Sequence, residues 1–500
     1  MKRGIQIVDV SHDLGLDEYE AHASLARAVQ ELRAEAATLV PALAGRRVWM
    51  VNSTPQGGGV AEMLPRLVSL LRELGVPAEW AVIGTGEQRF FDLTKRLHNL
   101  IHGTGTPGFS TADRELYERV NRDNADDLAR RLAPGDLLVI HDPQPMALGA
   151  LLAERLRLPA LWRCHIGLDR ENAATASAWD FLAPYAGGYD HAVFSAPEYV
   201  RAFPPHRAAV IHPALDPLSD KNRLLSPVRL TGVLANACLV RHHEQVLTPP
   251  FADTVERLAP DGRFVPAEQA EPIGILYRPL VTQISRWDRL KGWLPLLAGF
   301  AHLKRGETAL ARAGGGPDPL HDRRRRIVRL VLAGPDPASI QDDPEGREVL
   351  DALRAAYQEL PADLQRDVAI LSLPMSSRRQ NALIVNALQR ASTVVVQNSI
   401  EEGFGLTVAE AMWKRAAVVG SRACGIRQQI RDGVDGRLIA DPSDPATVAD
   451  CLDEVLAHPR ERATWGRNAE RRAHDAFLVF TQIAQWLRLL VRVVEARPEA

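Results

Sequence analysis

The sequence predicts an α/β protein of two large domains, each a parallel β-sheet covered by helices. At 500 residues the chain is too long for one ordinary hydrophobic core, so at least two domains are expected. Short β-rich runs alternate with amphipathic helical stretches, which is typical of parallel sheets flanked by helices. The alternation breaks at the polar segment PALDPLSDKN after His212 and then restarts. We therefore predict two Rossmann-like domains, over residues 1–220 and 221–476.

The first domain is predicted to contain a strand, a glycine loop and a helix in direct succession. Arg47–Ser53 (RVWMVNS) has the composition of a strand, and four leucines of Ala61–Leu74 fall on one helical face. The further strands expected in this domain are 78–83, 136–141, 160–165, 191–195 and 208–212.

The second domain is predicted to repeat the same alternation. Its expected strands are 280–285, 327–333, 368–373, 393–397, 417–420 and 437–439. Between the first two of these, Gly314–Pro319 (GGGPDP) and the arginine run Arg323–Arg326 are interpreted as a loop or insertion with a solvated surface.

The overall charge excludes a general attraction to nucleic acid or to an anionic membrane. Lys and Arg (60) nearly balance Asp and Glu (62), so an anionic ligand must be held by a local group of cations. The first twenty residues carry five acidic side chains and no continuous apolar stretch, and no apolar run approaches the roughly 20 residues that span a bilayer. We expect a cytoplasmic protein whose four scattered cysteines are reduced and mostly buried. The oligomeric state stays open, and a homodimer is one of the states the sequence allows.

The most informative segment is Glu402–Gly420 (EGFGLTVAEAMWKRAAVVG), which follows a predicted strand and opens a helix. Gly403 and Gly405 permit a tight turn and close approach of the backbone to a ligand. The helix that starts near Leu406 directs unpaired N–H groups and the positive end of its dipole at whatever lies above it. The segment therefore predicts a diphosphate site. The alternative is a strand-to-helix turn with two surface acids.

A second segment, Ser285–Gly292 (SRWDRLKG), supplies local positive charge. Arg286 ends a predicted strand and Lys291 follows five residues later. At the carboxyl edge of a parallel sheet these two cations are placed to neutralise a leaving diphosphate. The alternative is a pair of solvated surface cations.

The glycine loop of the first domain, Asn52–Glu62 (NSTPQGGGVAE), matches neither the GxGxxG dinucleotide pattern nor a phosphate loop ending in Gly-Lys-Ser/Thr. The sequence thus argues against a dehydrogenase and against a P-loop kinase. The three successive glycines Gly57–Gly59 still allow backbone amides to approach a sugar or a phosphate. A loop that only turns the chain is the alternative.

Polar side chains close two neighbouring strands of the first domain. HDPQP at 141–145 and WRCHIGL at 162–168 place five of them at one sheet edge: His141, Asp142, Gln144, Arg163 and His165. Such groups suit the recognition of hydroxyls, because a buried polar group left unpaired is costly. No histidine and acid spacing matches a known ligand pattern, so a metal site is not expected.

These residues resemble the retaining glycosyltransferases of the GT-B type (glycosyltransferase family 4 type). The general marks are the two cations of SRWDRLKG and the two glutamates of EGFGLTVAE. More narrowly, the trehalose glycosyltransferring synthases and the trehalose phosphorylases share several motifs with this chain in the same order: VNSTPQGGGVAEML, FFDLTKRLHN, HDPQP, WRCHIGLD, HPALDPLSDKN, DDPEG and VNALQRAS. The similarity runs from about residue 40 to the C-terminus.

The resemblance implies a GT-B fold, with two Rossmann-like domains facing each other across a cleft and the helix near 477–500 crossing back to the first domain. Four apolar residues of that helix share one face: Ile483, Trp486, Leu487 and Leu490. It also implies transfer of glucose from a nucleoside diphosphate glucose to glucose, with formation of α,α-trehalose. The N-terminal domain would bind the acceptor and the C-terminal domain the donor.

The resemblance assigns roles to named side chains. The expected catalytic residues are Arg286, Lys291, Glu402 and His165. The residues expected to bind the donor are Gly58, Gly59, Gly403, Phe404, Gly405, Leu406 and Glu410. Those expected to bind the acceptor are Asn52, Asp142, Gln144 and Arg163. No metal and no cofactor beyond the nucleotide-sugar co-substrate is implied, and the partners are small molecules: the nucleotide-sugar, glucose and trehalose.

Two positions depart from the pattern, since Gly167 stands where a more polar residue is expected and Glu401 where a basic residue is common. The donor base, adenine or uracil, stays open. Two other functions also stay open. One is a phosphorylase that uses inorganic phosphate in place of the nucleoside diphosphate, and the other is a sugar-nucleotide-binding protein without catalysis.

Overall fold

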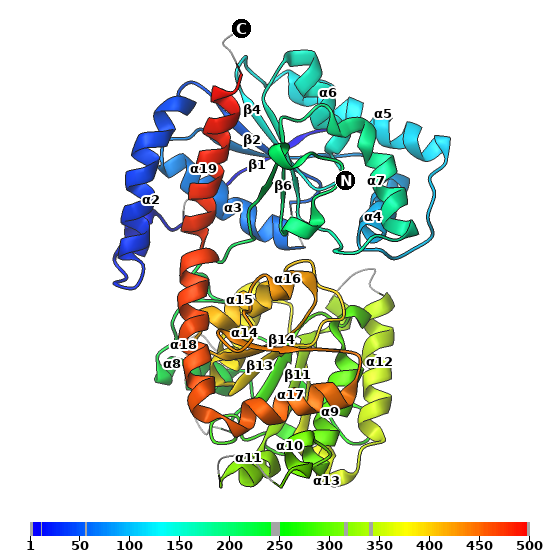
Figure 1. Ribbon diagram of the computed structural model, residues 1–500, viewed down its shortest axis with the longest axis vertical. Coiled ribbons are helices and arrows are strands. Elements are labelled where there is room, and N and C mark those ends of the chain that lie inside the picture. The colour runs from blue at the N-terminus through cyan, green and yellow to red at the C-terminus, as the bar shows by residue number, and fades with distance from the viewer. Residues whose placement is uncertain are drawn as a thin grey trace. The chain divides into compact units, whose positions relative to one another are not determined.

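The computed structural model describes residues 4–11, 13–55, 58–241, 251–314, 319–339 and 344–497. The chain divides into two compact units (Figure 1): unit 1 consists of Met1–Ala214 and Ala476–Ala500, and unit 2 is Leu215–Asp475. The sequence predicts that the first domain ends at residue 220. The structure ends it at Ala214, so the segment 215–220 belongs to unit 2.

Unit 1 is built on a seven-stranded sheet in the order β1-β3-β2-β4-β5-β6-β7. All neighbouring pairs are parallel except β1, which runs antiparallel to β3. The strands are β1 (Gln6–Val8), β2 (Val48–Asn52), β3 (Ala78–Val82), β4 (Leu137–His141), β5 (Ala160–Cys164), β6 (His191–Phe194) and β7 (Ala208–Val210). The six strands expected from the sequence are present, and the three-residue β1 is added to them. All residues of β2, β4 and β5 are buried, as in a sheet covered on both faces.

Helices lie on both sides of this sheet (Figure 1). One group consists of α1 (Leu16–Glu20), α2 (Ala26–Leu39), η1 (Val40–Leu43), α3 (Gly58–Glu73) and α19 (Val479–Glu495). The other consists of α4 (Gln88–Ile101), α5 (Thr111–Ala129), α6 (Met146–Leu156) and α7 (Ala173–Ala186). Short 3-10 turns, η2 (Pro197–Tyr199) and η3 (Pro205–Arg207), connect β6 and β7.

The helix α19 belongs to unit 1, as the sequence predicts. It packs on α2, where Arg488 Nη2 lies 2.7 Å from Glu35 Oε2. The ring of Phe480 meets Tyr19 edge to face, with 5.2 Å between the ring centroids. All four residues expected on its apolar face are buried.

Unit 2 contains an eight-stranded sheet in the order β15-β14-β13-β10-β11-β12-β8-β9. The strands are β8 (Glu256–Leu258), β9 (Phe264–Pro266), β10 (Leu280–Ile284), β11 (Arg329–Pro335), β12 (Val368–Leu373), β13 (Val394–Gln397), β14 (Ala417–Ser421) and β15 (Gly436–Ile439). The six strands expected from the sequence form its parallel part. The hairpin β8–β9 is antiparallel and was not expected.

Alternate residues of the central strands supply two separate apolar cores, one on each face of the unit 2 sheet. Leu330 and Leu332 of β11 join a core that includes Trp287 and Trp293. Val331, which lies between them in the strand, joins a second core with residues of the helices Pro227–Asn236 and Arg378–Ala391. This period of two is the geometry of an extended strand, which sends successive side chains to opposite faces of the sheet.

The helices of unit 2 cover both faces of its sheet (Figure 1). They are α8 (Pro227–Asn236), α9 (Trp293–Arg305), α10 (Ala309–Arg312), α11 (His321–Ile327), α12 (Pro344–Gln358), α13 (Ala362–Asp367), α14 (Arg378–Ala391), α15 (Leu406–Trp413), α16 (Cys424–Arg427), α17 (Pro445–Ala457) and α18 (Pro459–Ala476), with 3-10 turns η4 (Ala267–Gln269), η5 (Arg289–Lys291) and η6 (Pro337–Ser339).

The arginine run Arg323–Arg326 lies in helix α11 and not in a loop, which corrects the interpretation from sequence. His321 in the same helix is buried, and its Nε2 lies 2.8 Å from Asp453 Oδ1. Residues 315–318 of the expected loop lie outside the described residues.

The four cysteines are free thiols, of which Cys164, Cys424 and Cys451 are buried. Over the described ranges, none of the helices combines the length and the apolar character needed to cross a membrane.

Candidate functional site

The polar residues singled out in the sequence gather in two places, one in each unit. Arg286, Lys291 and Glu402 follow β10 and β13 of unit 2, which are parallel neighbours, so their carboxyl ends share one sheet edge. His141 and Arg163 are register partners on β4 and β5 of unit 1. Each group is therefore positioned by the ends of two adjacent strands.

The turn after β10 is held in place by buried polar side chains. Gln283 donates from Nε2 to the carbonyl of Lys291 at 2.8 Å and accepts from the backbone N–H of Asn398 at 2.8 Å. Gly292 has φ +62°, and a Cβ there would collide with the carbonyl of Asn398. The turn that carries Lys291 is thus tied to the segment after β13.

Lys291 and Glu402 form a mostly buried ion pair. Lys291 Nζ lies 2.8 Å from Glu402 Oε2, and each side chain is only 13% exposed. The same oxygen accepts from Ser399 Oγ at 3.0 Å. The cation expected at the phosphates and the carboxylate expected at the sugar are therefore in direct contact.

Arg286 differs from Lys291 in its surroundings. Its side chain is 70% exposed, and Nη2 lies 3.9 Å from Asp288 Oδ2, which is a loose pairing. The structure therefore leaves the Arg286 guanidinium accessible to an anion, while Lys291 is held by its neighbours.

The EGFG turn has the backbone that the sequence predicts. Gly405 is the N-cap of α15 with φ +83°, a conformation that favours glycine. A Cβ on Gly425 would collide with the backbone of Phe404, and Gln429 donates from Nε2 to the carbonyl of Phe404. Gly425 and Gln429 thus hold the turn in place, and the first N–H groups of α15 begin at Leu406.

Glu410 is a buried carboxylate one turn into α15. Its side chain is 7% exposed, and Oε1 lies 3.6 Å from Lys221 Nζ. Lys414 donates from Nζ to the Glu410 carbonyl at 3.2 Å and to Asn222 Oδ1 at 3.1 Å. Burial lowers the pKa of Lys414 to about 7, against the opposing effect of Glu410.

In unit 1 the glycine loop is shorter than the sequence predicts. Helix α3 begins at Gly58, so Gly58 and Gly59 lie in its first turn and not in a loop, while Gly57 lies outside the described residues. The Asn52 side chain accepts from Trp80 Nε1 at 2.8 Å and donates to the Thr54 carbonyl at 2.7 Å. Its amide therefore holds the start of this loop against β3.

His141 and His165 are stacked and share a hydrogen bond. His141 Nδ1 lies 3.0 Å from His165 Nε2, and the ring planes are 15° apart. Burial and the charge of Arg163 lower the pKa of His141 to about 3 and hold the pKa of His165 well below 6.5. Both rings are therefore neutral at physiological pH.

The contact with Met50 decides which nitrogens carry protons. A thioether sulfur has no proton, so His141 Nε2, 3.4 Å from Met50 Sδ, is the donor of that contact. In a neutral ring Nδ1 of His141 is then the acceptor, and His165 Nε2 donates to it. His165 Nδ1 is left as a lone-pair acceptor.

Three buried polar atoms of this group have no hydrogen-bond partner among the described residues: His165 Nδ1, Arg163 Nη1 and Gln144 Oε1. Two of them are acceptors and one is a cationic donor. Hydroxyl groups both donate and accept, so they are the natural complement to such a set.

Asp142 has a backbone role as well as a charge. Its φ is +65°, and its Oδ1 accepts from the backbone N–H of His165 at 2.9 Å. Burial raises the pKa of Asp142 to about 6. The carboxylate thus joins the ends of β4 and β5. Within the described parts of the chain, no three His, Cys, Asp or Glu side chains are grouped as metal ligands.

These pKa shifts predict that the stability of unit 1 rises with pH between about pH 4 and pH 6. In that range the unfolded chain binds protons at both histidines and not at Asp142, whereas the folded chain binds one proton at Asp142 and none at the histidines. The unfolded state then binds one more proton, so acid favours it. Denaturant titrations at several pH values measure the slope.

The control for this prediction is the His141→Phe variant, in which one histidine is removed. His165 and Asp142 then compensate each other, so the slope should be close to zero. A variant with the full slope of the parent protein would contradict the assignment.

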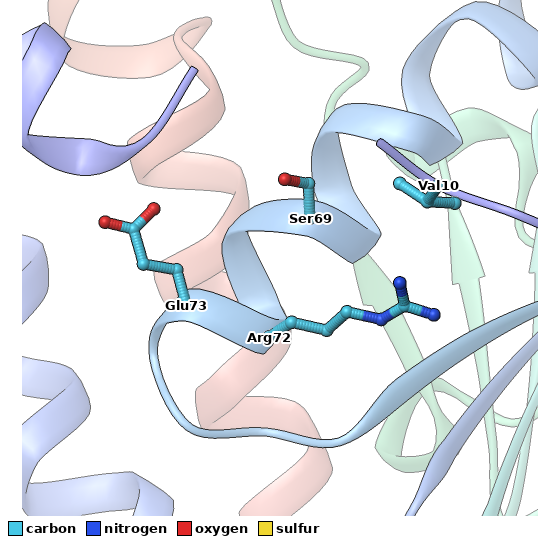
Figure 2. A pocket seen from close by; sticks show the side chains of 4 residues that line it. All are labelled: Val10, Ser69, Arg72 and Glu73. Carbon is cyan, nitrogen blue, oxygen red and sulfur yellow. The ribbon is translucent and has the colours of Figure 1, made fainter. Parts of the chain in front are cut away.

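A hollow of about 280 Å³ on unit 1 lies apart from these residues (Figure 2). It is lined by Val10, Ser69, Arg72 and Glu73. Arg72 pairs with Glu79 at 2.9 Å, and Glu73 accepts from the backbone N–H of Leu16 at 2.8 Å. The charged lining groups thus bind neighbouring parts of unit 1, and we assign the hollow a structural role.

Two residues near these groups were missed from the sequence. Lys221 lies in the shared motif HPALDPLSDKN, but the motif gives it no partner, and only the fold brings it to Glu410. Tyr199 lies on Gly167, where a Cβ would collide with the ring. This contact gives the physical reason for a glycine where a polar residue was expected.

Two family descriptions match the chain. "Trehalose synthase, N-terminal domain" matches residues 50–201, and "Glycosyl transferases group 1" matches residues 377–472. The first range holds the polar group of unit 1, and the second holds Glu402 and Glu410. The sequence places these two groups in separate domains, and the two family descriptions also match separate parts of the chain.

Several known proteins are similar to this chain over about nine-tenths of its length. The trehalose synthase of Pyrococcus horikoshii is 33% identical over 90% of this chain and 90% of its own length. A trehalose phosphorylase of Grifola frondosa is 25% identical over 90% of this chain and 58% of its own length. Among solved structures, the α,α-trehalose 6-phosphate synthase of Burkholderia multivorans has a TM-score of 0.63 at 18% identity, over 91% of this chain and 99% of that structure, and it has the GT-B fold. The chain therefore belongs to the trehalose synthase family of GT-B glycosyltransferases.

Proposed function

We propose that this protein is a cytoplasmic, retaining glucosyltransferase that moves glucose from a nucleoside diphosphate glucose to free glucose and forms α,α-trehalose. The observation that carries the proposal is the Lys291–Glu402 pair at the carboxyl edge of the unit 2 sheet. It sets a cation for a diphosphate beside a carboxylate for a sugar.

The remaining groups of unit 2 fit a nucleotide-sugar donor. Arg286 is exposed next to the same turn, and the first turn of α15 directs N–H groups outward from Gly405. A helix N-terminus and two cations complement a diphosphate in charge and in hydrogen bonding. Glu410 supplies a carboxylate that accepts from the ribose hydroxyls.

The polar group of unit 1 fits a neutral sugar as acceptor. The unpartnered atoms of Gln144, Arg163 and His165 are the kind that hydroxyl groups satisfy. A site of this kind selects strongly, because a ligand that lacks the matching hydroxyl leaves buried polar atoms unpaired. We assign acceptor binding to unit 1 and donor binding to unit 2.

The reaction we propose is a displacement on one face of the glucose ring. The bond from the anomeric carbon to the leaving phosphate oxygen breaks, and an acceptor hydroxyl oxygen forms the new bond on the same face. The leaving diphosphate takes the proton of that hydroxyl. Arg286 and Lys291 stabilise the negative charge that develops on the diphosphate, while Asp142, bonded to the His165 backbone, has no role as a nucleophile.

Synthesis of trehalose is favoured over its phosphorolysis by the extent of the similarity. The trehalose synthase of Pyrococcus horikoshii shares 33% identity over nine-tenths of its length, and the phosphorylase of Grifola frondosa shares 25% over 58% of its length. Phosphorolysis of trehalose remains the second candidate, because the same cations complement inorganic phosphate.

A donor screen tests the proposal. The protein is incubated with glucose and with ADP-glucose or UDP-glucose, and the product is read by mass and by the NMR couplings of its anomeric protons. Formation of α,α-trehalose supports the proposal, and a β-linked product contradicts retention. In the reverse direction, trehalose is supplied with a nucleoside diphosphate or with phosphate. Turnover with phosphate alone would identify a phosphorylase, and no turnover with any pair would identify a binding protein.

A further inference from the structure

We propose that Lys221, from the segment that enters unit 2, is a positioning residue of the donor site: its ammonium holds the Glu410 carboxylate oriented toward the ribose of a nucleotide. The proposal rests on the donor role proposed for Glu410. Lys221 does not act on the reacting atoms, so it differs in kind from Lys291.

The first observation is the contact itself. Lys221 Nζ lies 3.6 Å from Glu410 Oε1, with the lysine side chain 33% exposed and the glutamate side chain 7% exposed. A carboxylate buried to this degree is costly to keep charged without a cation close by. The other lysine nearby, Lys414, donates to the backbone carbonyl of Glu410 and not to its carboxylate. Lys221 is thus the ammonium group that pairs with the Glu410 side chain.

The second observation is that the chain on both sides of Lys221 is fixed to the helices of the donor site. Asn386 donates from Nδ2 to the carbonyl of Asp220 at 3.0 Å. The carbonyl of Asn222 accepts from Arg390 Nη2 at 3.1 Å and from Trp413 Nε1 at 3.2 Å. Because the flanking backbone is bound to α14 and α15, the Lys221 ammonium is delivered to a defined place beside Glu410.

The third observation comes from composition. Six of the 60 basic Lys and Arg residues are lysine: Lys2, Lys95, Lys221, Lys291, Lys304 and Lys414. Three of these six, Lys221, Lys291 and Lys414, contact Glu402 or Glu410. Half of the lysines of this arginine-rich chain therefore lie beside the two glutamates of the proposed donor site. This concentration marks Lys221 as part of the same site as Lys291.

The test compares nucleotides that differ only in the ribose hydroxyls. Calorimetric titrations use ADP and UDP and their 2′,3′-dideoxy forms with the parent protein and with the variants Lys221→Met, Glu410→Gln and Arg223→Met. Arg223 is the matched control, because it is a cation of the same segment that pairs with Asp220 at 2.8 Å. Thermal unfolding of each variant confirms that it is folded.

We expect the parent protein to prefer the ribonucleotide, and Lys221→Met to bind it roughly tenfold more weakly, the effect of about 1.4 kcal/mol. The variant should lose most of its preference for ribose over dideoxyribose, as Glu410→Gln should, while Arg223→Met keeps it. If Lys221→Met kept its full preference for ribose over dideoxyribose, the inference about Lys221 would be overturned and the proposed function would not. Equal binding of both sugars by the parent protein would also overturn it, while nucleotide binding stands. Binding of neither ADP nor UDP would instead overturn the proposed function.

Discussion

Replacement of Lys291 by alanine should weaken transition-state stabilisation by about 2–4 kcal/mol, or about 30- to 1,000-fold in kcat/KM. This is the range for removal of one preorganised electrostatic donor. Lys291 is held for that role, since its carbonyl accepts from Gln283 and its Nζ pairs with Glu402 at 2.8 Å. The truncation removes the cation, while the Ser399 hydroxyl still donates to Glu402. Steady-state kinetics with varied donor at saturating glucose measures the loss.

Arg289→Ala is the matched control for Lys291→Ala. Arg289 lies in the same 3-10 turn, but its guanidinium is 68% exposed and pairs with Glu348. Loss of an exposed ion pair has a small effect, so activity should stay close to that of the parent protein. Unchanged turnover in Lys291→Ala, or an equal loss in both variants, would remove Lys291 from the catalytic group.

Replacement of His165 by alanine should lower transfer to glucose by about 100-fold, the scale of one lost preorganised hydrogen-bonding group. The affinity for nucleoside diphosphate should stay nearly unchanged, because the groups proposed to bind the nucleotide belong to unit 2. The reason for the loss is chemical: His165 Nδ1 is an acceptor that a sugar hydroxyl completes. Kinetics with varied glucose and calorimetry with nucleotide separate the two effects.

The control for His165→Ala is His206→Ala, since His206 is an exposed histidine of the same unit. It should change neither transfer nor nucleotide affinity. If His165→Ala lost nucleotide binding and kept its turnover at saturation, the division of roles between the two units would be wrong.

The fold could be predicted from the sequence largely because its parallel strands are strongly apolar. Strands such as β4 and β12 are buried along their whole length, and such strands give continuous apolar runs that patterns detect. Strands β1, β8 and β9 have only three residues each and were missed, whereas the equally short β7 lies in the longer apolar run AAVI at 208–211. The start of α3 was missed because three glycines favour a loop over a helix in any local pattern.

The candidate site was predictable where a motif lies next to a strand end, as at Lys291 and Glu402. What a motif does not contain is the contact between the two, which depends on β10 and β13 being neighbours although they are over 100 positions apart in the chain. Lys221 and Tyr199 escaped for the same reason, since each meets its partner only through the tertiary fold. The roles of the site residues stay predictions that the variants above test.

The position of α19 has a consequence for how the protein is made. Glu35 and Arg488, which pair α2 with α19, are 453 positions apart, and all of unit 2 is translated between them. At about 5–20 residues per second, unit 2 takes roughly 15 to 50 s to synthesise. During that time α2 has been synthesised and α19 has not. The residues of α2 that are buried in the finished protein are Val29, Leu32 and Ala36. Unit 1 is thus started first and completed last, because its last helix follows the whole of unit 2 in the chain.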